Sequence, residues 1–140
     1  MQANIRTENI QTTIYSMNAD FSGRNDMKDY DATKPLQIHR RNRAFVWSLE
    51  MQKQCLDSIL KGYYIPPIIC CSNIVNGVEI RQIMEGGNRA TTFRRILNKE
   101  VKDLTDIEYN KVCSHPITLV IMKNLTNNDR IINHKQKYPP

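Results

Sequence analysis

The hydrophobic pattern changes its period near Glu85, and this change constrains the fold more than any other feature of the sequence. Before Glu85, residues 78–84 alternate between two faces, with the period of two that is typical of a half-buried strand. Gly86 and Gly87 follow, and apolar residues then recur at helical spacing, at Ala90, Phe93, Ile96 and Leu97. The sequence therefore predicts a strand, a tight glycine turn and a helix in direct succession.

Local signals predict further strands and helices on both sides of this turn. Ser48 is placed to cap a helix that ends near Gly62, a residue that tolerates left-handed backbone. The Asn76-Gly77 pair is the strongest short signal for a hairpin. The expected strands are Leu36–Arg41, Ile68–Ile74, Val78–Met84 and Ile117–Met122, and a weaker helix is expected at Asp103–Val112. Because helices and strands alternate irregularly, we expect an α+β fold.

The two ends of the chain lack such patterns. Residues 1–35 contain few apolar residues and no clear period, which predicts an irregular N-terminal arm with at most a short strand near Thr12–Met17. Polar residues dominate after Asn124. The expected organisation is therefore an N-terminal extension over residues 1–35, a domain over residues 36–125 and a C-terminal tail over residues 126–140.

The composition excludes several classes of protein. With 40% hydrophobic and 24% charged residues, the 140-residue chain has the composition of an ordinary globular domain. No stretch approaches the roughly 18 apolar residues of a membrane helix, and Met1–Ile14 is too polar for a signal peptide. We therefore expect an intracellular protein with reduced thiols. The motif Cys113-Ser114-His115 has no matching second pair, so we expect the cysteines to be small buried hydrophobes rather than zinc ligands.

The net charge of +6 is unevenly distributed along the chain. Residues 1–36 contain four basic and five acidic residues, whereas residues 37–140 contain 16 basic and nine acidic residues. The basic residues cluster at Arg40, Arg41 and Arg43, at Arg89, Arg94 and Arg95, and at Arg130, Lys135 and Lys137. Such clusters suit partners that carry phosphate, and the alternative is a solvated basic face without a partner.

The Glu85–Arg89 turn has the features of an anion site. Glycines let backbone amides approach a phosphate, and the helix start directs unpaired N–H groups and a positive dipole end toward it. Arg89 adds a forked donor that matches phosphate oxygens, and Glu85 could hold Mg²⁺ or orient a water. The alternative is a turn that only reverses the chain, with Arg89 on the surface.

Two further segments, together with this turn, resemble the motifs of a known family. The first is Asn42-Arg43-Ala44-Phe45-Val46-Trp47-Ser48, and the second is Leu56–Gly62 followed by Ile65-Pro66-Pro67-Ile68. In order and spacing they resemble the "QR-x-Y-x-W", "D/S-I-L-x-G … I-P" and D-G-Q-Q-R motifs of the N-terminal domain of GmrSD-type restriction enzymes, a family related to ParB and sulfiredoxin. The resemblance covers about residues 36–125.

This resemblance implies a ParB/sulfiredoxin-like fold, a small mixed sheet with flanking helices. It also implies that the turn binds a nucleoside triphosphate and hydrolyses it, often in DNA restriction or phage defence. Carried over by position, Glu85 replaces the Asp as the catalytic residue and Mg²⁺ ligand. The nucleotide-binding and phosphate-binding positions fall on Arg43, Gly86, Gly87, Asn88 and Arg89, with Asn42 in place of the earlier Gln. We therefore expect Arg43 and Arg89 to open onto one pocket.

This chain departs from the family motif in ways that should impair hydrolysis of the nucleotide more than its binding. Glutamate in place of aspartate shifts the carboxylate by about one methylene, and glycine in place of glutamine removes a side chain. Positioning errors near 1 Å can cost about a hundredfold in rate. The resemblance also implies a family domain that usually extends beyond residue 125 and is often followed by a nuclease domain, so we expect that this sequence is truncated relative to that domain.

Three functions stay open at this point. The first is a nucleotide-binding domain, with or without hydrolysis, that works in nucleic-acid processing or restriction. The second is a DNA-binding or nuclease-like module, and the third is a non-catalytic viral or phage structural or interaction protein that retains the fold. Phe45 and Trp47 could stack on a base, but an aromatic pair beside a helix start is more often part of the core, and we expect that placement here.

Overall fold

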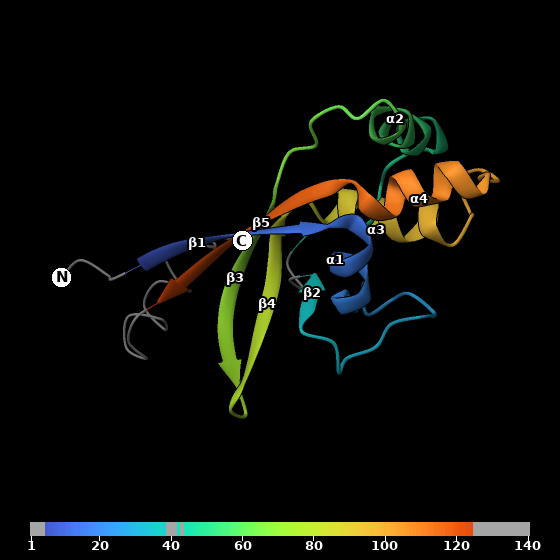
Figure 1. Cartoon of the computed structure of the whole chain (residues 1–140). Coiled ribbons are helices and arrows are strands. Elements are labelled where there is room, and N and C mark those ends of the chain that lie inside the picture. Colours follow the sequence, from blue (N-terminus) through green and yellow to red (C-terminus); the bar gives the residue numbers. More distant parts are fainter. Residues whose placement is uncertain (1–4, 39–41, 43, 125–140) are drawn as a thin grey trace.

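The computed structural model describes residues 5–38, 42 and 44–124. In this part of the chain, five strands form one sheet and four helices accompany it (Figure 1). In chain order the elements are β1 (Ile5–Thr13), α1 (Ile14–Asp20), β2 (Leu36–Ile38), α2 (Leu49–Leu60), β3 (Ile68–Val75), β4 (Val78–Glu85), α3 (Gly87–Leu97), α4 (Asp106–Ser114) and β5 (Pro116–Asn124). The α+β prediction is thus confirmed.

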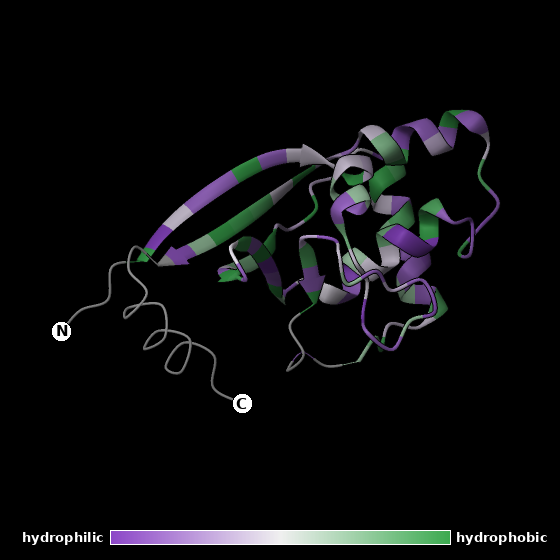
Figure 2. Ribbon diagram, turned by 90° about the horizontal axis from the view of Figure 1, so that it is seen from below, coloured by the Kyte–Doolittle hydropathy of each residue, from purple (hydrophilic) through white to green (hydrophobic). Residues whose placement is uncertain are grey.

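The sheet is mixed, with the strand order β1-β5-β3-β4-β2. The pairs β1–β5 and β3–β4 are antiparallel, whereas β3–β5 and β2–β4 are parallel. Figure 2 shows hydrophilic residues along much of the edge strand β1, whereas the inner strand β5 is largely hydrophobic. This difference follows from position, because an inner strand meets side chains on both of its neighbours and an edge strand does not.

The predicted irregular arm is wrong for residues 5–20. The strand β1 pairs with β5 along its whole length, from Ile5 opposite Asn124 to Thr13 opposite Pro116. The helix α1 then buries Ile14 and Met17, and Phe21 directly after it is fully buried. The pattern is weak in β1 because its main partners are backbone groups far away in the sequence. Ile10, for example, pairs with Leu119 on β5, 109 positions away.

Most of the other predicted elements are confirmed with small shifts. Ser48 caps α2, because its hydroxyl accepts a hydrogen bond from the Met51 amide at 3.2 Å. Asn76 and Gly77 join β3 to β4 with φ values of 51° and 80°, as expected for a tight hairpin. The helix α4 begins three residues later than predicted, since Thr105 supplies its cap. Of the predicted strand Leu36–Arg41, residues 36–38 form β2 and residues 39–41 lie outside the described residues.

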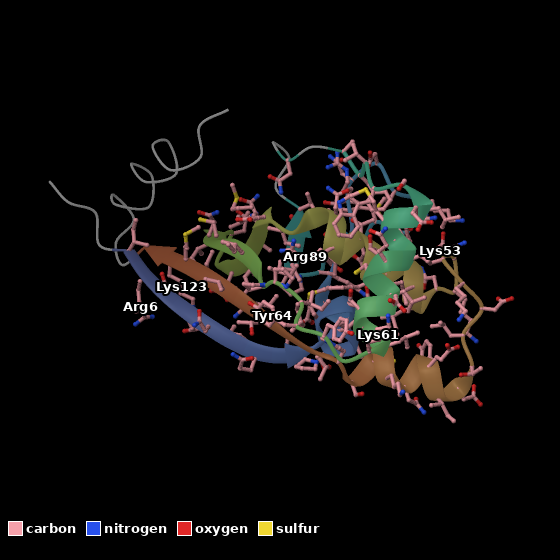
Figure 3. The ribbon with its side chains drawn as sticks, turned by 90° about the horizontal axis from the view of Figure 1, so that it is seen from above. Arg6, Lys53, Lys61, Tyr64, Arg89 and Lys123 are labelled. Atoms are coloured by element: carbon pink, nitrogen blue, oxygen red, sulfur yellow. The ribbon has the colours of Figure 1, made fainter. Side chains whose placement is uncertain are left out.

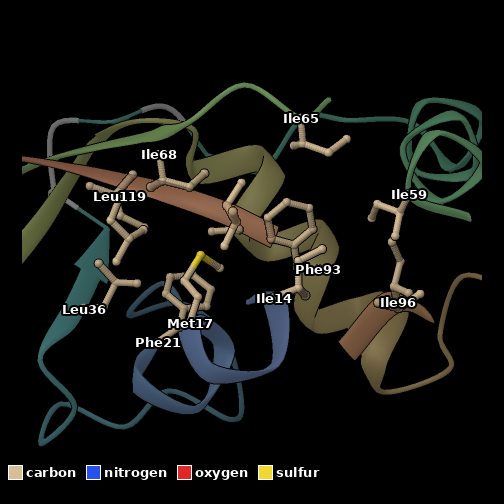
Figure 4. Close-up of a cluster of buried hydrophobic side chains, with 14 of the residues drawn as sticks. Ile14, Met17, Phe21, Leu36, Ile59, Ile65, Ile68, Phe93, Ile96 and Leu119 are labelled. Carbon is tan, nitrogen blue, oxygen red and sulfur yellow. The ribbon is translucent and has the colours of Figure 1, made fainter. Parts of the chain in front are cut away.

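The hydrophobic core lies where α1 and α3 pack against the sheet (Figure 4). Its largest fully buried side chains include Phe21 and Phe93, around which the aliphatic side chains of Ile14, Met17, Leu36, Ile68 and Ile96 gather. The helix α2 buries Leu56 and Ile59 in this core, and Cys55 and Leu60 pack against it.

The cysteines are free thiols, and Cys70 and Cys71 are buried, as expected of small hydrophobic residues. Burial raises the pKa of Cys55 to about 11 and that of Cys70 to about 12, so both thiols are protonated at neutral pH. Within residues 5–38, 42 and 44–124, no group of three or more His, Cys, Asp or Glu side chains is arranged to hold a metal ion. None of the helices in the same residues is long and apolar enough to cross a membrane.

Candidate functional site

The turn between β4 and α3 has the predicted strand–turn–helix geometry. Gly86 has a φ of 102°, in the region that side chains disfavour, and it precedes α3 without a side-chain cap. An added Cβ at Gly86 would lie 2.6 Å from Ile68 Cδ1. The Ala90 amide donates to the Gly86 carbonyl at 2.9 Å, so the amides of Gly87, Asn88 and Arg89 precede the first bond within the helix.

The two other segments of the family resemblance are hydrogen-bonded to this turn or to the strand before it. The Asn42 side-chain amide donates to the Ile83 carbonyl at 2.8 Å. The Val46 backbone amide donates to Asn88 Oδ1 at 2.9 Å. Arg89 Nη2 donates to the Pro67 carbonyl at 2.7 Å. Segments that lie 22 to 42 positions apart in the sequence therefore meet at the start of α3.

Arg89 is the cation of this site, and its guanidinium is partly buried. Nη2 binds Pro67, while Nε is buried and has no hydrogen-bond partner among the described residues. Burial lowers the pKa of Arg89, and the neighbouring Glu85, Cys55 and Tyr64 act in the opposite direction. Arginine stays protonated at any physiological pH, so the site holds a fixed positive charge with an unused donor.

A cleft of about 340 Å³ adjoins Arg89, between α2 and the linker 61–67 that follows it. We call it the α2 cleft; it is lined by Trp47, Met51, Gln54, Cys55, Ser58, Tyr64, Ile65, Pro66 and Arg89. Figure 3 shows Tyr64 on the linker and Arg89 at the start of α3, both at the same side of α2. The lining combines two aromatic rings, apolar groups, a side-chain amide and one cation.

The predicted site residues have different surroundings. Glu85 is exposed at the end of β4 and lies close enough to Arg89 to act on its charge. A Cβ added at Gly87 would lie 3.7 Å from Ile38 Cδ1 and 3.8 Å from Asn42 Nδ2, both ordinary contact distances. Arg43 lies outside the described residues, so its convergence with Arg89 on one pocket stays a prediction.

The expectation that Phe45 and Trp47 belong to the core is wrong. Both are half-buried, because residues 44–48 approach α2 from outside the core cluster. Trp47 lines the α2 cleft, and the Arg95 guanidinium lies 5.9 Å from the centre of the Phe45 ring. Tyr64 and Gln54 also line the cleft but were not predicted from the sequence. The only local signal was the position of Tyr64 directly before the Ile-Pro-Pro segment.

The predicted cluster of Arg89, Arg94 and Arg95 does not form one phosphate-facing patch. Arg94 is buried, where it donates to Asn18 Oδ1 and the Phe21 carbonyl and pairs with Asp29 at 3.5 Å. The Arg94 guanidinium also lies over the Phe21 ring. Successive helical positions point in different directions, so Arg94 ties α3 to the loop after α1 rather than to a ligand.

The basic surplus of the chain also lies largely outside the described residues. Residues 1–4, 39–41, 43 and 125–140 contain six of the 20 Lys and Arg residues but only one of the 14 Asp and Glu residues. The described residues therefore carry 14 basic against 13 acidic side chains. A phosphate-binding role for the described part must rest on local geometry, not on its overall charge.

Comparison of the chain with models of protein families finds no match, and comparisons with curated proteins and with solved structures find none either. The family resemblance thus stays a prediction that rests on its three motifs.

Proposed function

We propose that this chain binds a nucleoside triphosphate, or another phosphate compound, at the first turn of α3. The observation that carries the proposal is the convergence of the three motif segments, through the Asn42–Ile83, Val46–Asn88 and Arg89–Pro67 hydrogen bonds. In the same proposal, the mixed sheet with its flanking helices is a ParB/sulfiredoxin-like domain that acts in nucleic-acid processing or restriction.

The parts needed for binding phosphate are present together. The amides of the first turn of α3 and the positive end of the helix dipole favour an anion. Arg89 contributes a planar cation whose buried Nε lacks a partner among the described side chains and backbone groups. The helix amides and the Arg89 charge would stabilise a phosphate directly, whereas the buried Nε could donate to it only after the Arg89 side chain moves.

The exposed carboxylate of Glu85 fits a magnesium ion only in part. Mg²⁺ in nucleotide sites is usually held by one or two carboxylates together with phosphate oxygens and waters. Glu85 can supply one carboxylate next to the phosphate site. The Mg²⁺ ion would neutralise phosphate charge there, and Glu85 would set its position.

We expect the protein to bind a nucleoside triphosphate, or another phosphate compound, more readily than it hydrolyses one. Gly87 has no side chain to orient a water, and the side-chain oxygen Oδ1 of Asn88 already accepts a hydrogen bond from the Val46 amide. Of the two residues that could orient an attacking water, Gly87 therefore has no side chain and Asn88 already binds Val46. The same contacts favour the alternative of a non-catalytic structural or interaction protein, because Asn88 and Arg89 both hold other segments in place.

Isothermal titration with ATP, GTP, CTP and UTP, with and without Mg²⁺, tests the proposal. Arg89→Ala should weaken binding by about 1.5–3 kcal/mol, as expected for the loss of a charged hydrogen bond. Glu85→Ala should weaken binding chiefly when Mg²⁺ is present. Arg95→Ala is the matched control, because it removes the same charge from the last turn of the same helix.

Arg89→Ala also loses the bond to Pro67, so urea unfolding must show that the variant is folded at the titration temperature. Absence of wild-type binding to every triphosphate would discard the proposal and favour the structural alternative. Rapid turnover by the wild type would refute the expectation that binding exceeds hydrolysis.

A further inference from the structure

The α2 cleft contains more aromatic and apolar surface than a phosphate site requires. Beside Arg89, its lining includes the rings of Trp47 and Tyr64 and the apolar side chains of Met51 and Ile65. A free phosphate would use only the cation and backbone amides. The rest of the cleft therefore suits a ligand that is planar and aromatic at one end and anionic at the other.

The Tyr64 ring is exposed, but its backbone is held on both sides. The side chain is 80% exposed, although the next residue, Ile65, is buried. The Tyr63 amide donates to the Ser58 carbonyl at 2.9 Å, and the Tyr63 carbonyl lies 3.0 Å from His115 Nε2. An aromatic ring presented to water on a fixed backbone loses little conformational entropy when a second ring stacks on it.

Trp47 also lines the cleft, and hydrogen bonds hold its backbone in a similar way. The amide of the preceding Val46 donates to Asn88, and Gln52 Nε2 donates to the Trp47 carbonyl at 3.2 Å. The two aromatic residues thus come from separate segments that are each anchored by hydrogen bonds. Such anchoring favours a preformed site over one that forms only when the ligand binds.

The size and polar groups of the cleft agree with a nucleoside. A volume of about 340 Å³ lies within the range of small-molecule sites, roughly 300–1,000 Å³. The Gln54 amide can both donate and accept hydrogen bonds, as the edge of a base requires. The nearby cations Lys53, on α2, and Lys61, directly after it, do not line the cleft, and Lys61 is paired with Asp57 at 2.9 Å. Arg89 is therefore the cation placed to receive the phosphate.

We propose that the α2 cleft is a nucleobase site, in which Trp47 and Tyr64 stack on the base while the phosphates lie at Arg89. This inference rests on the proposed phosphate site and narrows its ligand to a nucleotide. Inorganic phosphates would then bind only at Arg89, without contacts to Trp47 and Tyr64.

Fluorescence provides a direct test, because Trp47 is the only tryptophan in the chain. The wild-type protein is titrated with ATP, GTP, CTP and UTP, with inorganic triphosphate and with adenosine, and N-acetyltryptophanamide corrects for absorption by the ligands. We expect at least one nucleoside triphosphate to quench Trp47 and to bind at least about tenfold more tightly than inorganic triphosphate. Inorganic triphosphate should leave the Trp47 signal nearly unchanged.

Substitutions at Tyr64 and Tyr63 distinguish the loss of base stacking from a nonspecific effect of removing an exposed tyrosine. Tyr64→Ala should weaken nucleotide binding about 5- to 150-fold, as expected for the loss of one stacked base, and Tyr64→Phe should retain it. Tyr63→Ala is the matched control, because Tyr63 is 58% exposed and does not line the α2 cleft. It should change affinity by less than about twofold.

The outcomes distinguish this inference from the proposed function. Equal affinity for inorganic triphosphate and nucleotides, unchanged by Tyr64→Ala, would overturn the nucleobase site and leave the phosphate site intact. Binding of adenosine with quenching of Trp47, and with no contribution from phosphate, would support the nucleobase site and reject the phosphate site. Failure of every ligand to bind would reject both and would favour a protein segment as the occupant of the cleft.

Discussion

The first turns of α3 and α4 solve the same problem in different ways. Each helix begins with backbone amides that have no partner within the helix. In α4, the Thr105 hydroxyl accepts from the Glu108 amide at 3.1 Å, and the Glu108 carboxylate accepts from the Thr105 amide at 3.0 Å. In α3, Gly86 has no side chain to offer, and no acidic residue lies in the first turn.

The side chains of the two first turns therefore have different partners. In α4 they bind the amides of their own helix, so the start of the helix is complete within a few residues of sequence. In α3, Asn88 and Arg89 bind Val46 and Pro67 on other segments, so they cannot also cap the helix. The difference shows that tertiary contacts shape the start of α3, and that no side chain caps its first amides.

The largest expected effect comes from Gly86→Ala. The added Cβ would clash with Ile68 Cδ1 and approach Arg89 Nη2 at 3.0 Å, in a backbone conformation with a φ of 102°. Together, strain and overpacking should lower the free energy of unfolding by about 2–4 kcal/mol. Gly77→Ala is the control, because its φ is 80° but nothing lies within 4 Å. Urea unfolding should show a smaller loss at Gly77, and equal losses would contradict the close packing at Gly86.

Asn88→Asp should move stability and affinity in opposite directions. Aspartate keeps the acceptor for the Val46 amide and places a negative charge in the first turn of α3. That charge should stabilise the helix by about 0.3–1 kcal/mol and weaken phosphate binding by about tenfold through repulsion. Thermal unfolding and titration with a triphosphate measure the two effects.

Asn98→Asp is the control for this variant, because it adds the same charge at the C-terminal cap of the same helix. It should destabilise α3 slightly and leave phosphate affinity nearly unchanged. If both variants weakened binding equally, the phosphate would not be located at the start of α3.

Thr105→Ala should destabilise the protein by about 1 kcal/mol, the usual cost of losing an N-cap. Because the capping box of α4 is satisfied within the helix, triphosphate affinity should stay the same. Urea unfolding and a parallel titration check both statements. A loss of triphosphate affinity in Thr105→Ala would show that the starts of α3 and α4 are coupled and would contradict the self-contained capping of α4.

The smallest effect is a pH dependence that belongs to α4 and not to α3. The bond from the Thr105 amide, followed by Lys102, lowers the pKa of Glu108. A carboxylate with a lowered pKa stabilises the fold above its ordinary titration range, and this contribution is lost as the pH falls through the lowered value. Glu108→Gln should therefore be less stable than the wild type at neutral pH, and the difference should shrink in acid. A difference that stays constant with pH, measured by urea unfolding, would contradict a role for the charge.

The start of α3 also shows how far a site can be predicted from sequence. The change of hydrophobic period and the two glycines located the turn, and the positive φ of Gly86 followed from them. The partners of Asn88 and Arg89 could not be predicted, because a hydrogen bond to Val46 or Pro67 depends on how distant segments approach. Tyr64 has no periodic pattern, since a single exposed ring has no period, and its only local signal is its position directly before Ile65-Pro66-Pro67.

The sequence by itself determined the features that depend on a few neighbouring residues. These are the cap at Ser48, the Asn76-Gly77 hairpin and the strand–turn–helix around Gly86, all of which follow from local backbone preferences and hydrogen bonds.

Only the tertiary structure decided that β1 is a sheet strand, that Arg94 is buried and that Trp47 and Tyr64 line one cleft. The physical reason is the range of the interactions. A cap or a tight turn forms among a few adjacent residues, whereas a β-pair, a buried cation or a cleft needs contacts between segments whose distance in sequence leaves no local trace.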